Sequence, residues 1–118
     1  MVFDCPCAGV FIEPLTGPGR IILCAARADQ PYSTRFSDFF LPAWTSPVAD
    51  YDNDGLVSVL EAFQYASLQI EALYDQSDLR KTEIPLLEDN GDGVPSQRPW
   101  AFVSDAQDGE ASRRLFVR

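Results

Sequence analysis

Hydrophobic positions recur most regularly between residues 58 and 76. Apolar side chains are spaced there at intervals of three and four: Val59, Leu60, Phe63, Ala66, Ile70, Leu73 and Tyr74. Such spacing places them on one face of a helix, and the polar residues between them fall largely on the other side. The pattern predicts a helix over 58–76 that packs one face on a sheet and leaves the other in water.

Shorter apolar runs predict the remaining elements. The unbroken run 21–26 (IILCAA) is typical of a strand covered on both faces. The run 37–44, with Ser37 as a candidate cap and Pro47 soon after it, predicts a short helix. Further strand candidates are residues 1–3, 82–87, 100–103 and 115–118. We therefore expect a single domain over 1–118 of the α/β class, with a small mostly parallel sheet and flanking helices.

The charge of the chain narrows the classes of partner. Among 118 residues, 9 are Lys or Arg and 18 are Asp or Glu, so the formal net charge is −9. Such a surface repels nucleic acid and anionic lipid and favours cations or basic partners. No apolar run approaches the ~20 residues that span a bilayer. We expect neither nucleic-acid nor membrane binding.

Histidine and cysteine usage bears on catalysis and on location. The chain has no histidine, which removes the commonest general base near neutral pH and the commonest nitrogen ligand of zinc. The cysteines, Cys5, Cys7 and Cys24, are few and odd in number, unlike a disulfide framework. A reducing, cytoplasmic location is therefore the expectation.

The segment 50–61 has the spacing of an EF-hand calcium loop. Aspartates occupy positions 1, 3 and 5, and Gly55 at position 6 permits the sharp turn that brings their carboxylates together. Position 12 is a glutamate that would bind the ion through both oxygens. The predicted ligands are the side chains of Asp50, Asp52, Asp54, Ser58 (directly or through water) and Glu61, with the backbone carbonyl of Leu56.

A purely structural interpretation of the same residues competes with calcium. Ser58 and Glu61 form an SxxE capping box for the following helix, and DNDG is a common surface turn. Four carboxylates packed without a cation would repel one another, which favours calcium. Pro47 precedes the loop in place of a regular entering helix, so we expect an unpaired loop with an affinity of ~10⁻⁶ to 10⁻³ M.

A second acidic run, 88–93, repeats the first half of this pattern. Counting Glu88 as position 1 puts Pro99 at position 12, so no carboxylate closes the loop. A hydrated turn is favoured over a second calcium site. Asn90 or Asp92 could instead complete the first site from outside.

Several segments, in this order, resemble the second half of bacterial caspase-like proteins of the legumain-related cysteine peptidase clan. They are CPCAGVFIEPL at 5–15, GPGRIILCAARAD at 17–29, FSDFFLPAW at 36–44, DYDNDGLVSVLEAFQYA at 50–66 and LLEDNGDG at 86–93. The resemblance implies half of a caspase-like fold, a parallel sheet between helices. It also implies a nucleophilic cysteine just after a strand, in a pattern like DxCxSG.

The chain departs from that pattern where the chemistry would occur. Aligning Asp4 and Gly9 with the motif puts Pro6 at the place of the nucleophile. Cys5 and Cys7 flank this place as alternative nucleophiles, and the histidine base would lie in a missing half of the fold. Together with Cys24 they could otherwise form a metal thiolate site, which would leave zinc one ligand short.

The sequence thus predicts a calcium-binding, non-catalytic caspase-like module in which the cation stabilises the loop before the long helix. One alternative is a fragment of a legumain-like or caspase-like cysteine peptidase. Another is a metal-independent scaffold. The open edge of a half-fold sheet would suit a protein partner or a second copy of the chain.

Overall fold

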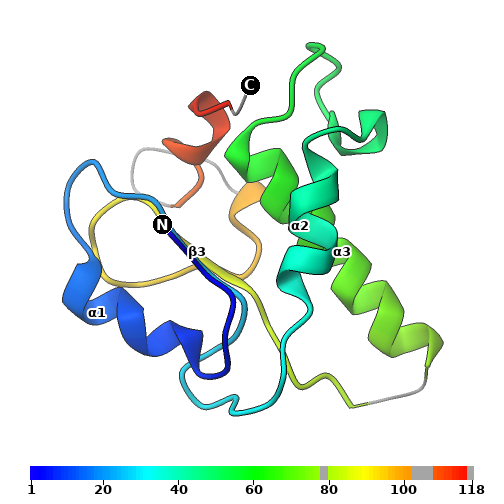
Figure 1. The fold of residues 1–118 in the computed structure, drawn as a ribbon. Helices are drawn as coiled ribbons and strands as arrows, with labels where there is room; N and C mark the ends of the chain where they lie inside the picture. The colour runs from blue at the N-terminus through cyan, green and yellow to red at the C-terminus, as the bar shows by residue number, and fades with distance from the viewer. Residues whose placement is uncertain (78–79, 102–107, 117–118) are drawn as a thin grey trace.

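The computed structural model describes residues 1–77, 80–101 and 108–116, which form a mixed α/β fold around a small sheet (Figure 1). The strands β1 (Val2–Phe3), β2 (Ile22–Cys24) and β3 (Leu86–Glu88) lie in the order β1-β2-β3. The helices are α1 (Ile12–Leu15), α2 (Phe36–Ala43) and α3 (Val59–Gln76). The predicted long helix, short helix and buried central strand are confirmed.

The sheet is mixed, so the prediction of a mostly parallel sheet is wrong. β1 pairs in parallel with β2, with Phe3 opposite Cys24, whereas β3 pairs antiparallel with β2, with Leu87 opposite Leu23. The cause lies in the connection from β2 to β3. It contains two helices that run in opposite directions (Figure 1), so the chain returns to the end of the sheet that it left.

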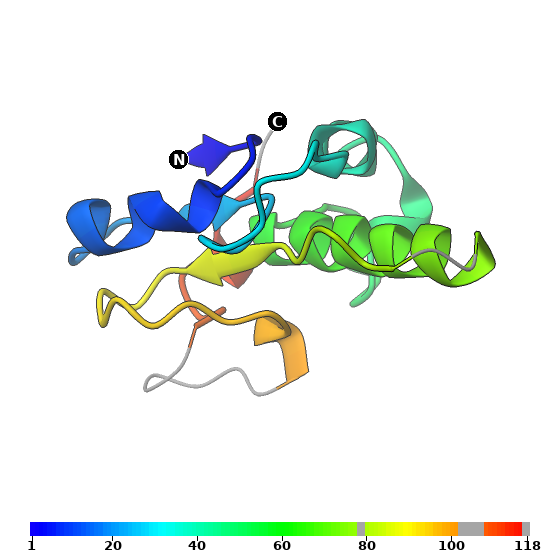
Figure 2. The same cartoon turned by 90° about the horizontal axis from the view of Figure 1, so that it is seen from below.

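The central strand β2 is buried on both faces because its side chains alternate between two apolar clusters. Leu23 points into the main cluster, where Phe36 of α2 and Phe63 of α3 pack with ring centroids 5.9 Å apart. Ile22 and Cys24 point into a smaller cluster beneath α1. The sheet therefore lies between α1 on one side and the α2–α3 pair on the other (Figure 2).

The start of α2 is capped from a distance, contrary to the prediction that Ser37 caps it. The N-cap residue is Arg35, and its side chain makes no capping hydrogen bond. The Ser37 amide instead donates to the Asp4 carboxylate at 3.1 Å, and the Arg35 amide donates to the buried Glu83 carboxylate at 3.1 Å. These acceptors lie far away in the sequence, so a local capping pattern does not reveal them.

The last segments only partly follow the sequence prediction. Trp100 lies in a 3-10 helix, η3 (Pro99–Ala101), rather than in a strand. Phe116 forms an isolated antiparallel bridge with Ser58, and the Val59 amide donates to the Leu115 carbonyl at 2.8 Å. The other residues of the two strand candidates, 102–103 and 117–118, lie outside the described residues.

The strand β1 lies at an edge of the sheet, where the sequence predicts an open edge. Among the described residues, β2 is the sole strand paired with β1, and Val2 is 47% exposed. A partner at this edge stays a prediction. No helix in the described ranges is both long and apolar enough to cross a membrane.

Candidate metal centre

The predicted calcium loop connects the 3-10 helix η2 (Pro47–Ala49) to α3 through a tight turn. Asp50 ends η2, and Ser58 is the N-cap residue of α3. Two residues between them have left-handed backbone, Asn53 with φ 58° and Gly55 with φ 86°. Position 6 of the loop therefore makes the turn for which the sequence pattern requires glycine.

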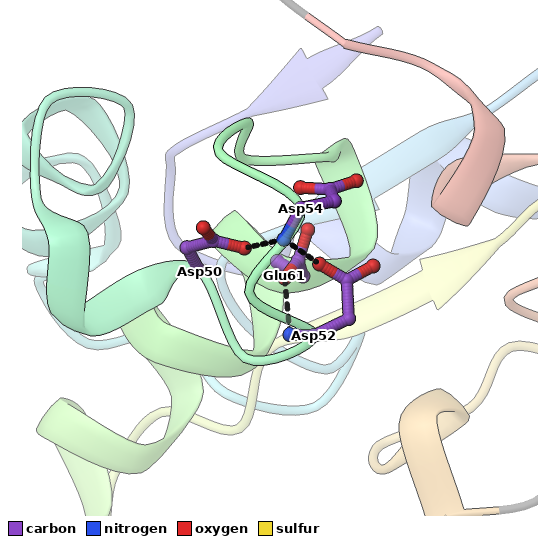
Figure 3. Close-up of side chains that lie close together, drawn as sticks. All are labelled: Asp50, Asp52, Asp54 and Glu61. Carbon is purple, nitrogen blue, oxygen red and sulfur yellow. Dashed lines mark hydrogen bonds between the residues drawn. The ribbon is translucent and has the colours of Figure 1, made fainter.

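Backbone amides of the loop hold the aspartate side chains in place. The Asp54 amide donates to Asp50 and to Asp52, at 3.2 Å in each case, and the Gly55 amide donates to Asp50 at 2.9 Å. The Leu56 amide in turn donates to Asp54 at 2.9 Å. The carboxylates consequently gather around the turn (Figure 3).

Four side chains that are spread over the loop offer oxygens at one place. Asp50, Asp52, Asp54 and Glu61, called here the first acidic cluster, each place a carboxylate oxygen within 4.8 Å of the others. Calcium binds oxygen at 2.3–2.6 Å, so ligands on opposite sides of the ion are about 4.6–5.2 Å apart. The cluster therefore has dimensions that could hold a calcium ion.

Glu61 is the most buried member of the first acidic cluster, and it closes both the loop and the helix. It is 7% exposed, and its Oε1 accepts the Ser58 amide at 3.0 Å while the Ser58 hydroxyl accepts the Glu61 amide at 3.2 Å. Its Oε2 accepts the Tyr51 amide at 2.7 Å and the Asp52 amide at 3.2 Å. The predicted capping box is present.

The hydrogen bonds of Glu61 limit how it could bind an ion. A carboxylate has about four lone-pair positions, and three backbone amides already use three of those of Glu61. One position is left for a cation. Bidentate binding by Glu61, as the sequence predicts, would require some of these amide bonds to open or to be shared.

The two remaining predicted ligands lie on the helix side of the loop. Ser58 is 2% exposed, and its hydroxyl serves the helix cap. The Leu56 side chain is 44% exposed, which suits a residue whose backbone carbonyl would be the ligand. Val57, at position 8 of the pattern, packs against the main apolar cluster. Coordination by Ser58 and Leu56 stays a prediction.

The pKa values of Asp50 and Asp52 are shifted in opposite directions. Loss of solvent together with the carboxylates of Asp50, Glu61 and Asp54 raises the pKa of Asp52 to about 6. Loss of solvent also acts on Asp50, but amide donors such as that of Gly55 outweigh it and lower the pKa of Asp50. The first acidic cluster thus contains one carboxyl that is a weaker acid than a free aspartate, and a bound cation would favour its ionised form.

A second group of acidic side chains lies at the far end of β3. Glu88, Asp92 and Asp108, called here the second acidic cluster, also place carboxylate oxygens within 4.8 Å of one another. The sequence interpretation that Asp92 completes the first site is wrong, because Asp92 groups with Glu88 and Asp108 instead. No sequence spacing pointed to Asp108, which reaches the cluster from another segment of the chain.

The carboxylates around the second acidic cluster are tied into hydrogen bonds. Glu88 is fully buried and accepts the Gly91 amide at 2.8 Å and the Thr16 hydroxyl. Asp108, 1% exposed, accepts the Asp89 amide at 3.0 Å and the Ser96 hydroxyl at 2.7 Å. This part of the fold therefore has a structural use for its acidic residues without any ion.

The stability of the protein should depend on pH through Asp108. Burial, followed by the Asp89 and Glu88 carboxylates, raises the pKa of Asp108 to about 6. Because an unfolded aspartate titrates near 3.9, the folded state retains a proton that the unfolded state loses. The free energy of unfolding should therefore fall as pH rises from about 4 to about 6, by about 3 kcal/mol.

Chemical denaturation in chelator across this pH range measures the effect. Asp108→Asn is the matched control, because its amide can accept from the Asp89 amide and donate to the Ser96 hydroxyl while carrying no charge. The variant should lose this part of the pH dependence. An unchanged slope in Asp108→Asn would contradict the assignment.

The cysteines do not form the metal site that the sequence left open. Among the residues that the structure describes, the groups that could hold a metal are acidic and contain no thiol. Cys24 is fully buried and its thiol donates to the Ala8 carbonyl at 3.3 Å. Burial, with a smaller contribution from Cys5, raises the pKa of Cys24 to about 12. A thiolate on Cys24 is therefore strongly disfavoured.

The two candidate nucleophiles lie just after β1, and both are free thiols of intermediate burial. Cys7 has left-handed backbone with φ 57°, and its amide donates to the Gln30 carbonyl at 2.9 Å. The chain supplies no histidine to either thiol. Catalysis by Cys5 or Cys7 stays a prediction that requires a base from outside the chain.

A functional proposal for this chain rests on the geometry of its acidic clusters. No protein-family model, curated protein or solved structure matches this chain. The resemblance to caspase-like proteins therefore stays an expectation from the sequence. What the structure adds is a mixed α/β fold with two clusters of carboxylates that could bind a metal ion.

Proposed function

We propose that this chain is a calcium-binding, non-catalytic caspase-like module, in which the ion stabilises the loop before α3. The observation that supports the calcium-binding part of this proposal is the first acidic cluster, whose four carboxylate oxygens lie within 4.8 Å of one another. The cluster combines a loop spacing that suits calcium with side chains already gathered by backbone amides. Two of its four members, Asp52 and Asp54, are exposed, and Asp50 is half-buried.

The type of ion follows from the ligand chemistry. Carboxylate and carbonyl oxygens suit hard cations, whereas zinc and copper prefer nitrogen and sulfur ligands. Magnesium demands a near-ideal octahedron at 2.0–2.1 Å and gives up its water reluctantly. Calcium accepts six to eight oxygens in flexible geometry, and the spacing of residues 50–61 is that of a calcium loop, so calcium is the ion that we propose.

The physical effect of the ion would be local. Two positive charges would offset the repulsion among Asp50, Asp52 and Asp54, and they would fix the turn through Gly55 against the start of α3. The free energy of unfolding should then rise with calcium concentration, because the gathered ligands exist only in the folded state. The expected role is a calcium-dependent structural or binding surface.

A calorimetric calcium titration of metal-stripped protein tests the proposal. The wild type should bind one ion in the first acidic cluster, and Asp54→Ala should lose this binding because it removes a ligand from the exposed part of the loop. Asp92→Ala is the control, since it removes one exposed carboxylate from the second acidic cluster alone. Magnesium as competitor should displace calcium poorly.

The outcomes separate the alternatives. Calcium binding lost in Asp92→Ala and kept in Asp54→Ala would move the site to the second acidic cluster. No heat and no change in melting temperature at millimolar calcium would leave the loop as a turn with a capping box, and a metal-independent scaffold would be the better account. Iodoacetamide labelling across pH tests the peptidase alternative, which requires a lowered thiol pKa at Cys5 or Cys7.

A further inference from the structure

A polar cavity of about 540 Å³ lies between the loop after β2 and residues 80–84, which precede β3. Both segments run along the lower edge of the molecule in Figure 1. The side chains of Arg27, Arg80 and Lys81 line the cavity. These are three of the nine basic residues in a chain with a formal net charge of −9. The cavity is therefore a basic site in an acidic protein.

Two of these positive charges have no acidic partner among the described residues. Arg27 pairs with Asp29, which also lines the cavity, at 2.9 Å. Within residues 1–77, 80–101 and 108–116, neither Arg80 nor Lys81 has an ion pair or a side-chain hydrogen bond, and both are exposed. The wall of the cavity thus has a surplus of two positive charges.

The neutral side chains of the wall add hydrogen-bond donors. The Oε1 of Gln30 accepts the amides of Arg27 and Ile84, both at 2.9 Å, which fixes the side-chain amide. Its Nε2 donors have no acceptor among the described residues, and the hydroxyl of Tyr32, a residue 59% exposed, has none either. A wall with positive charge and spare N–H and O–H donors suits an oxyanion.

We propose that this cavity binds a phosphate dianion, free or as a monoester. A phosphate group has a charge of about −1.5 to −2 near neutral pH, which matches the surplus contributed by Arg80 and Lys81. The cavity volume lies in the range of small-ligand sites. The negative charge of the whole chain disfavours a polyanion such as nucleic acid, which would also approach the acidic surface.

Titration with inorganic phosphate, in chelator and without calcium, tests the site by calorimetry or by amide chemical shifts. The wild type should show saturable binding that weakens with added salt. The double variant R80Q/K81Q should bind phosphate at least about tenfold more weakly than the wild type, because it removes two charge-assisted contacts. The control R113Q/R114Q removes the same charge from residues that pair with Glu110 elsewhere on the surface, and it should keep the affinity.

The results decide between a built site and a general charge effect. Absence of saturation in the wild type, or an equal loss in both double variants, would overturn the proposal. A second titration with a blocked phosphoserine shows whether the natural source is free phosphate or an ester, since a tighter ester indicates contacts beyond the dianion. Asp54→Ala should bind phosphate normally, so this test is independent of the calcium site.

Discussion

Replacing Glu61 with alanine should abolish calcium binding and lower the free energy of unfolding by about 2–4 kcal/mol. The side chain is 7% exposed and accepts amides from Tyr51, Asp52 and Ser58, which join the loop to the first turn of α3. Alanine would leave these three donors unsatisfied. Urea denaturation in chelator and a calcium titration of the same sample measure the two losses.

Ser58→Ala separates the cap of α3 from the metal. This variant removes the hydroxyl that accepts the Glu61 amide but keeps the Glu61 carboxylate in place. It should cost about 0.5–2 kcal/mol of stability, as loss of an N-cap does, and it should keep most of the calcium affinity. Full calcium affinity in Glu61→Ala would show that Glu61 is only a structural residue. A complete loss in Ser58→Ala would make its hydroxyl a ligand.

Asp89→Asn should be the other strongly destabilising change, at about 3 kcal/mol. Asp89 is 6% exposed and accepts the Gly109 amide at 2.8 Å, the Ser112 amide at 2.9 Å and the Ser112 hydroxyl at 2.7 Å. An asparagine would turn a donor NH₂ toward groups that donate themselves. Each buried donor left without an acceptor carries the cost of desolvation.

Denaturant unfolding compares this variant with Asp92→Asn. Asp92 lies three residues further along in the same loop, but it is exposed, and it accepts the Val94 amide at 2.8 Å at the surface. Its substitution should change stability by less than about 0.5 kcal/mol. If Asp89→Asn were equally mild, the buried network around Ser112 would not be holding residues 108–116 to the rest of the fold.

The parts of the fold that the sequence predicts are those set by local patterns. The helix α3 follows from one long apolar face and from the capping box of Ser58 and Glu61. The strand β2 follows from an unbroken apolar run whose residues point alternately into two clusters. The gathering of the loop aspartates follows from their spacing and from Gly55, since the turn and its ligands are neighbours in sequence.

The parts that the sequence does not predict depend on contacts between distant segments. The direction of β3 is set by the number of helices that precede it and by where they return the chain, which no strand pattern contains. Asp108 joins Glu88 across 20 positions of sequence, and the amide of Asp89 binds it. The donor-rich cavity around Arg80 is likewise built from two separate loops.

The contact between Asp4 and α2 gives this aspartate a structural role that is independent of catalysis. In the aligned pattern this aspartate accompanies a nucleophile, but here its carboxylate receives the Ser37 amide and the Thr34 hydroxyl and so anchors the start of a helix. Exchanging the thiols beside it would leave that anchor intact. An aspartate at this place therefore has a structural use of its own, and its presence in such a pattern is not by itself a mark of catalysis.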